Sequence, residues 1–239
     1  LTIDTEEEFD WEAPFRADGY GLDHIAALSG FQQFCEGIGV SPVYLVDWPV
    51  AQDARAQEII GDAIRRGQAE IGVQLHPWVN PPHHEEVNRR NSFAGNLPPE
   101  LEAEKFHCLR DLVEENFGAV PLIYRAGRYG LGPHTAGLLG EGGIAIDSSV
   151  RARFDYTDEG GPDYSRHPVA PYWADAGKTL LELPLTTSFW GMLRQQGQQL
   201  YPLAHRYPLL GSILAKTGML ERIGLTPEDI TLEEALRAV

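Results

Sequence analysis

The chain has 239 residues, of which 43% are hydrophobic and 23% charged, a composition typical of a globular protein with a packed core. Its net charge of −16 disfavours binding to nucleic acid or to an anionic membrane surface, because both are negatively charged. No apolar run approaches the roughly 20 residues that span a bilayer, so no membrane segment is expected. This length fits one barrel-like α/β domain or two small domains.

The two cysteines, Cys35 and Cys108, lie far apart and lack Cys-x-x-Cys spacing, so they predict neither a disulfide framework nor a zinc site. Both fall in helical stretches and are expected to be buried free thiols, which suits a reducing compartment and a cytoplasmic location. The chain begins at Leu1, without Met, and ends at Val239 in a helical run. We therefore expect a domain that is truncated at both ends.

Short apolar runs alternate with helical periodicity along the chain, and this alternation predicts a mainly parallel sheet. Strands are expected at residues 1–4, 43–46, 70–76, 121–124, 144–146 and 179–183. Helices are expected at 24–36, 51–66, 101–117 and 133–139, a helix start signal at Thr226-Pro227-Glu228, and mostly helix with turns over 200–239. The long segment 77–99 is expected to be a functional or disordered loop.

Six strands in this order favour an incomplete (β/α) barrel over an open doubly wound sheet, although an open sheet remains the alternative. The sequence contains no Gly-x-Gly-x-x-Gly or Walker-type loop, so a nucleotide-binding fold has no support.

Polar residues stand at the ends of successive predicted strands, and in a parallel barrel these ends share one rim. Each of these residue types also has a structural explanation. Asp4 and Glu6 can belong to a solvated acidic run with Glu7 and Glu8, Asp47 and Asp147 can cap the helices that follow, and Arg125 can form a buried salt bridge. The residues concerned are Asp4 with Glu6, then Asp47, His76, Arg125 and Asp147.

Two carboxylates and a histidine suffice to hold a divalent metal and to activate water. Asp4 and Glu6 are two residues apart on an extended chain, so their side chains point to the same face. One of them can bind the metal while the other remains a base. Arg125 could pair with that base and hold its pKa down.

Tryptophans add a hint about the substrate, because aromatic faces at the rim of a cleft stack on the apolar faces of sugar rings. Trp11, Trp48, Trp78 and Trp190 each follow a predicted strand. The alternative is that these side chains cover the rim of the core.

Four segments resemble the motifs of the polysaccharide deacetylase (NodB-homology) superfamily, and most of all its WalW-like branch: residues 1–7, 70–78, 125–130 and 180–184. The resemblance implies an α/β fold with a distorted (β/α)7-type barrel, complete or incomplete at its C-terminus, formed by residues 1–239 as one catalytic domain. It also implies metal-dependent removal of acetyl groups from a carbohydrate.

The resemblance assigns roles by position. Asp4 is similar to the catalytic base and Arg125 to the arginine that steadies it, while Glu6 and His76 are expected to bind a divalent metal, with zinc as the expected ion. The residues expected to contact the carbohydrate are Trp48, Trp78, Arg128, Tyr129 and Asp147.

Two departures from the family pattern affect the predicted site. The family has a second histidine four residues after the first, where this chain has Asn80, so His83 and His84 are the alternatives for that role. The family's general acid is a histidine on a late strand, and no such motif follows Leu183-Pro184. That histidine is expected beyond Val239, or else the enzyme is inactive or altered.

Two other hypotheses remain open from the sequence. One is a non-catalytic glycan-binding barrel that keeps the tryptophan-lined rim. The other is a glycosidase that pairs Asp4 or Glu6 with Asp147, which requires carboxylates about 5 to 10 Å apart and no metal. A carbohydrate is the expected partner in every case, and the oligomeric state is left open.

Overall fold

The computed structural model describes residues 1–11, 13–226 and 230–238, and its main feature is a seven-stranded sheet. The strand order is β1-β2-β3-β4-β5-β7-β6, and every neighbouring pair is parallel except β6 and β7. The strands are β1 (Thr2–Thr5), β2 (Val43–Val46), β3 (Glu70–Leu75), β4 (Ile123–Ala126), β5 (Ile146–Asp147), β6 (Tyr172–Trp173) and β7 (Leu181–Glu182).

This sheet confirms the predicted α/β fold with mainly parallel strands. From β1 to β5 each strand pairs with the next one in sequence, which is the order of a barrel and not of a doubly wound sheet. Among the described residues, no ladder joins β1 to β6, so the sheet is open between these two edges. All the parallel strands end at the same rim, as the sequence predicts.

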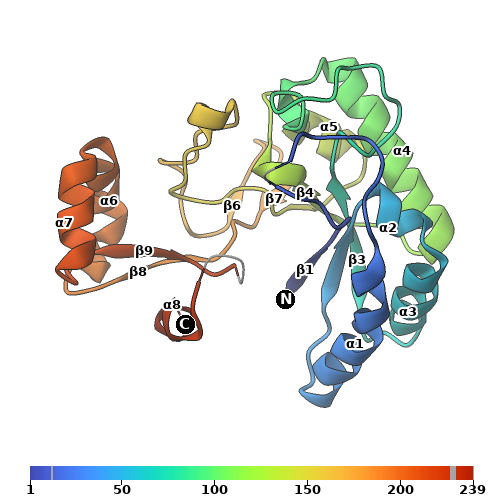
Figure 1. The fold of residues 1–239 in the computed structure, drawn as a ribbon, viewed down its shortest axis with the longest axis horizontal. Coiled ribbons are helices and arrows are strands. Elements are labelled where there is room, and N and C mark those ends of the chain that lie inside the picture. Colours follow the sequence, from blue (N-terminus) through green and yellow to red (C-terminus); the bar gives the residue numbers. More distant parts are fainter. Residues whose placement is uncertain (12, 227–229, 239) are drawn as a thin grey trace.

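Helices cover the outer face of the first strands (Figure 1). Their bounds are α1 (Leu28–Gly37), α2 (Trp48–Gln52), α3 (Ala54–Arg65), α4 (Pro99–Phe117) and α5 (Thr135–Glu141). The side chain of Asp53 accepts hydrogen bonds from the backbone N–H groups of Arg55 and Ala56 and so caps α3. Helix α4 begins with a proline and ends at Gly118, whose φ of 66° is the left-handed conformation that favours glycine.

One hydrophobic core lies between these helices and the sheet. The apolar faces of α3 and α4 supply Ile60, Phe106 and Leu109, which are fully buried against Tyr44 and Val73 of the strands. Burying each such side chain contributes on the order of 1.5–3 kcal/mol. The core therefore fixes the strands whose ends carry the polar residues.

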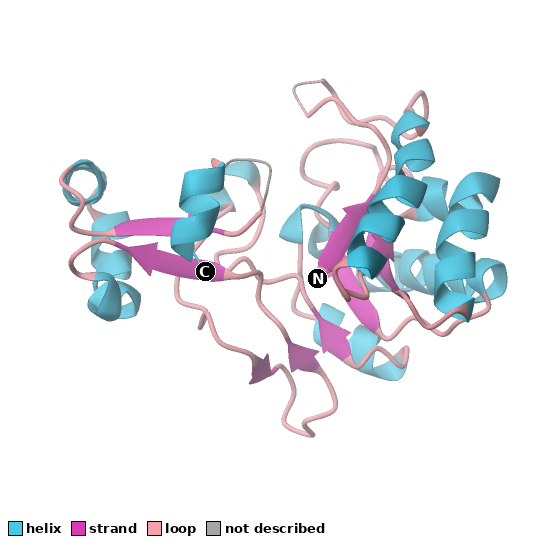
Figure 2. Cartoon of the chain, turned by 90° about the horizontal axis from the view of Figure 1, so that it is seen from below, coloured by secondary structure: helices cyan, strands magenta, loops and turns pink. Residues whose placement is uncertain are grey.

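A second, antiparallel sheet lies to one side of the main sheet (Figures 1 and 2). It consists of β8 (Thr187–Trp190) and β9 (Glu221–Gly224), accompanied by α6 (Gly197–Arg206), α7 (Pro208–Lys216) and α8 (Leu232–Ala238). The expectation of helix with turns over 200–239 is met by α6 to α8, but β9 interrupts it and β8 was not expected. The predicted start signal at Pro227-Glu228 lies outside the described residues.

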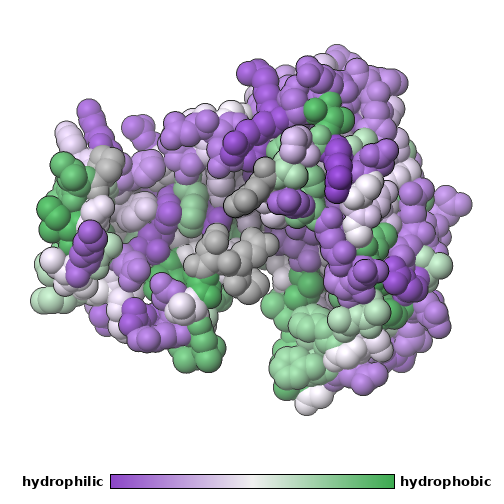
Figure 3. Space-filling model, viewed as in Figure 1, coloured by the Kyte–Doolittle hydropathy of each residue, from purple (hydrophilic) through white to green (hydrophobic). Residues whose placement is uncertain are grey.

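Apolar side chains lie among polar ones on the surface of this second unit near α7, as Figure 3 shows. Leu203, Leu209 and Ile213 are exposed there. Both cysteines are free thiols, as predicted, and Cys35 is buried. Cys108 was also expected to be buried but is partly exposed. Within the described part of the chain, none of the helices is long and apolar enough to cross a membrane.

Candidate active site

A pocket of about 420 Å³ opens at the carboxyl-terminal ends of β1, β3 and β4, where α/β proteins commonly bind small ligands. The structure brings five of the predicted site residues to it: Asp4, Glu6, His76, Arg128 and Tyr129. The remaining lining residues are Trp11, Gln74, Ala126, Tyr156 and Glu159.

His76 is the central side chain of this pocket, and each of its ring nitrogens faces a carboxylate. Its Nε2 lies 3.2 Å from Oε2 of Glu6, on the pocket side. Its Nδ1 lies 2.8 Å from Oε2 of Glu7, on the side of the protein interior. Only 1% of the His76 side chain is exposed, so its ring is held in one orientation.

Behind His76 lies a buried group formed by Glu7, Asp47 and His76, whose ligand atoms all fall within 4.8 Å of one another and could hold a metal ion. Each carboxylate oxygen of this group already has a partner. Trp78 Nε1 donates to Glu7 Oε1 at 2.6 Å, and the backbone N–H groups of Glu7 and Val50 donate to the two oxygens of Asp47. Glu7 is therefore placed to orient the imidazole, as carboxylates behind metal-binding histidines do.

Burial and charge act against each other in this group. Burial lowers the pKa of His76, but the carboxylates of Glu7 and Glu6 outweigh it, and the resulting pKa lies well above the ordinary value. Burial raises the pKa of Glu7, whereas His76 and the hydrogen bonds to Asp47 and Trp78 lower it to about 2. Burial, together with the nearby Glu7, raises the pKa of Asp47 well above its usual range.

Asp4 lies on β1 beside Arg125 of β4, and the two form an ion pair through Asp4 Oδ1. Burial raises the pKa of Asp4, and Arg125 opposes that rise. Arg125 is 5% exposed and also donates to the carbonyl and the hydroxyl of Ser148, at 2.9 and 3.0 Å. These contacts fix the guanidinium, so the carboxylate of Asp4 is held at the edge of the pocket.

The segment after β4 approaches His76 so closely that only glycine fits at its first position. A Cβ on Gly127 would lie 2.4 Å from Cδ2 of His76. The next two residues, Arg128 and Tyr129, have φ values of 54° and 60°, a strained conformation for side chains of this size. The guanidinium of Arg128 lies 4.1 Å from the ring centre of Phe93, which holds this turn against the pocket.

Three residues expected to contact the carbohydrate lie elsewhere. Trp78 is 1% exposed, and its ring stacks on His76 with the centroids 4.3 Å apart. Trp48 begins α2 and packs against the hydrophobic core. Asp147 is 2% exposed and forms hydrogen bonds with Ser149 and Glu182. Trp78 therefore supports the pocket from behind His76, whereas Trp48 and Asp147 do not line the pocket.

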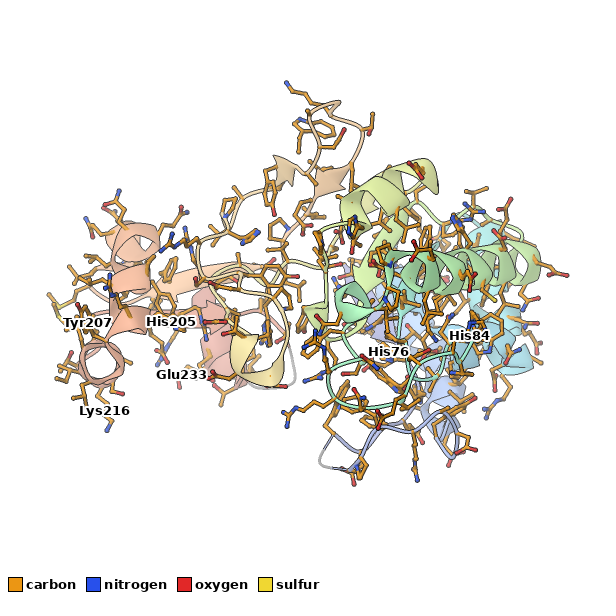
Figure 4. The ribbon with its side chains drawn as sticks, turned by 90° about the horizontal axis from the view of Figure 1, so that it is seen from above. His76, His84, His205, Tyr207, Lys216 and Glu233 are labelled. Carbon is orange, nitrogen blue, oxygen red and sulfur yellow. The ribbon has the colours of Figure 1, made fainter. Side chains whose placement is uncertain are left out.

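Asn80, at the place of the second family histidine, ties the loop to α4. Its Nδ2 donates to the carbonyl of Lys105 at 3.0 Å, and the buried ammonium of Lys105 donates to the carbonyls of Pro77 and Asn80. His84 is 69% exposed near Glu104 and does not line the pocket (Figure 4). The turn after His76 is therefore rigid, although it belongs to the long segment expected to be a loop.

Sequence reasoning missed several pocket residues. Gln74 precedes His76 by two positions on an extended strand, and this alternation was the signal that could have identified it. Glu7 was taken as part of an acidic run, yet it is fully buried beside His76. Tyr156 and Glu159 come from a segment in which no strand or helix was expected, and nothing in the sequence near them indicates the pocket.

No family model and no curated protein matches the sequence. Among solved structures, a candidate polysaccharide deacetylase from Mycobacterium smegmatis is 22% identical with a TM-score of 0.48, over 68% of this chain and 48% of that one. The 4-alpha-glucanotransferase of Thermococcus litoralis is 16% identical with a TM-score of 0.49, over 77% and 27%. A family 4 acetyl xylan esterase from Clostridium thermocellum, in complex with a cobalt ion, is 16% identical with a TM-score of 0.37, over 65% and 58%.

This chain spans between about a quarter and three fifths of the length of these three proteins. With identities below 25% and TM-scores below 0.5, the likenesses say nothing about its activity. Polysaccharide deacetylases, which the sequence motifs resemble, are thus among the proteins whose structures are similar to that of this chain.

Proposed function

We propose that this chain is a metal-dependent hydrolase that removes acetyl groups from a carbohydrate. The main support for this proposal is that Asp4, Glu6 and His76 line one pocket, where Nε2 of His76 faces Glu6. These side chains come from the carboxyl-terminal ends of β1 and β3, and neither helix capping nor solvation of an acidic run requires them to meet.

The donor atoms fit a divalent metal. An imidazole nitrogen and a carboxylate oxygen 3.2 Å apart suit zinc and similar ions, because donors bound at about 2.0–2.2 Å to one ion lie roughly 3 Å apart. We assign Glu6 and His76 as the residues that hold it, with Glu7 orienting the imidazole. When bound, the metal would supply Lewis acidity for activating water and polarising the acyl carbonyl.

Asp4 is the proposed base. Arg125 occupies its Oδ1, which leaves Oδ2 to accept a proton on the pocket side. Arg125 is fixed by Ser148 and by the hydroxyl of Thr2, so it keeps the carboxylate in place while the proton is transferred. Arg128, Tyr129 and the exposed Trp11 also line the pocket and are the groups available to bind a sugar ring.

The test combines metal content with acetate release. Elemental analysis of the wild type, the His76→Ala variant and the His84→Ala variant should give near-stoichiometric divalent metal in the first and third only. His84→Ala is the matched control because this histidine is exposed and lies outside the pocket. Metal-loaded wild type should release acetate from acetylated oligosaccharides, and Asp4→Asn should remove most of that activity while keeping the metal.

Other results would point to the rival functions. A wild type that takes up no metal but binds oligosaccharides would indicate a glycan-binding barrel. Cleavage of glycosidic bonds without metal would indicate a glycosidase. Either result would overturn the proposed function.

A further inference from the structure

We infer that Gln74 is a third protein donor of the metal site, binding the ion through its side-chain carbonyl oxygen; this inference rests on the proposed function. Gln74 lies on β3, two residues before His76, and its side chain turns to the same face. It lines the pocket, yet the residue is only 3% exposed. A buried polar side chain at this place needs partners for both ends of its amide.

The amide of Gln74 has a partner at one end only. Its Nε2 donates to Oε2 of Glu6 at 2.7 Å and lies 3.4 Å from Nε2 of His76. Its Oε1 is buried and has no hydrogen-bond partner among the described residues. Buried polar atoms without partners are rare in folded proteins. As the amide is oriented here, its amino group and not Oε1 faces Glu6 and His76, so an ion held by these residues would meet the carbonyl oxygen only after the amide turns.

The positions of the three side chains suit a single ion. Glu6 Oε2, His76 Nε2 and Gln74 Nε2, the place that the carbonyl oxygen would take after the amide turns, form a triangle with sides of 2.7, 3.2 and 3.4 Å. Atoms bound to one metal at about 2.1 Å have separations of this size. All three residues line the pocket, so water or substrate could reach an ion held there, as catalytic zinc sites require.

Charge determines which end of the amide faces Glu6 and His76. Without a cation, the amino group of Gln74 is attracted to the carboxylate of Glu6, which is the arrangement in the structure. A cation at this place attracts the carbonyl oxygen and repels the amino group. Because the two ends of an amide are similar in size, rotation about the last side-chain bond exchanges them without moving the strand.

Zinc titration calorimetry of the whole chain tests this assignment, with Gln74→Leu, Gln74→Glu and Gln32→Leu beside the wild type. Gln74→Leu should weaken zinc binding by about 100-fold, at the upper end of the 10–100-fold loss caused by removing an outer-shell partner. Gln74→Glu keeps an oxygen in place and should bind zinc as tightly as the wild type or more tightly. Gln32 is equally buried but lies outside the pocket, so Gln32→Leu should leave the affinity unchanged.

The alternative is that Gln74 only positions Glu6 through its N–H group. In that case Gln74→Glu would weaken zinc binding as much as Gln74→Leu does, because it loses the donor and adds a repelling carboxylate. That result, or an unchanged affinity in Gln74→Leu, would overturn the inference while leaving the proposed function intact. A wild type that binds no zinc would instead overturn the proposed function itself. Circular dichroism of each variant shows that the compared proteins are folded.

Discussion

The buried carboxylates of Asp147 and Glu182 should make the stability of this protein fall as the pH rises. They are direct partners across β5 and β7 and are 2% and 1% exposed. Burial, reinforced by the charge of Asp147, raises the pKa of Glu182 to about 10. Burial also raises the pKa of Asp147, to about 6, although hydrogen bonds from Ser149 oppose the rise.

The sign and size of the effect follow from the proton that Glu182 keeps in the folded state. An unfolded glutamate, with its pKa near 4.5, has lost that proton at neutral pH. The stabilising contribution is therefore complete below about pH 4.5 and is lost progressively as the pH rises toward 10. Above pH 6 this single proton should lower the free energy of unfolding by about 1.4 kcal/mol for each pH unit.

The Glu182→Gln variant removes this proton and keeps the shape of the side chain. Its amide oxygen can accept from the backbone N–H of Val150, as Oε1 of Glu182 does at 3.0 Å, and its amino group can donate to Asp147. Urea unfolding at pH 6.5, 7.5 and 8.5 should show the wild type losing stability relative to the variant by about 1.4 kcal/mol per unit. The exposed Glu58→Gln is the control for removing one negative charge. Equal slopes in wild type and Glu182→Gln would refute the reasoning.

Three further changes test the pocket. Glu7→Gln should weaken zinc binding about 10- to 100-fold, because it removes the carboxylate that orients the imidazole of His76. If a zinc titration of this variant showed no binding at all, Glu7 would itself be a ligand. Gly127→Ala should displace the ring of His76 and destabilise the fold by about 1–3 kcal/mol in urea unfolding. Its control, Gly137→Ala on α5, meets nothing within 4 Å and should not destabilise; equal effects of the two changes would contradict the packing argument. Trp11→Ala should raise KM for an oligosaccharide roughly threefold to tenfold through lost ring stacking, and an unchanged KM would exclude Trp11 from the binding surface.

The sequence predicted those elements whose signals are local. The strand at Val43–Val46 was placed with its correct bounds, because an apolar run lies between a proline and a capping aspartate. The helix expected at 101–117 is observed at Pro99–Phe117, with its start moved to the proline that favours a first turn. By contrast, β8 and β9 pair across more than 30 residues, and neither consists of an apolar run such as Val43–Val46, so neither carries a strand signal of its own.

The rim could also be predicted, but not the direction in which each polar group points. Parallel strands bring their carboxyl ends together, and Asp4, Glu6 and His76 do meet in one pocket. The run Asp4-Thr5-Glu6-Glu7-Glu8 gives no direct indication that its fourth residue is fully buried, because charged runs are usually solvated. Beside it lies Trp78, whose ring was expected to stack on a sugar; the ring is buried, and its indole N–H donates to Glu7.

Alternation along β1 explains how neighbouring acids came to have different surroundings. Asp4 and Glu6 turn toward the pocket, while Thr5 and Glu7 turn toward the interior and are 2% and 4% exposed. The imidazole of His76 lies between the two faces, so Glu6 contacts one ring nitrogen and Glu7 the other. Two consecutive residues directly after β1 thus hold a single histidine from both sides. With its Nδ1 held by Glu7, the ring presents Nε2 to the pocket, which is the orientation that a metal-binding histidine requires.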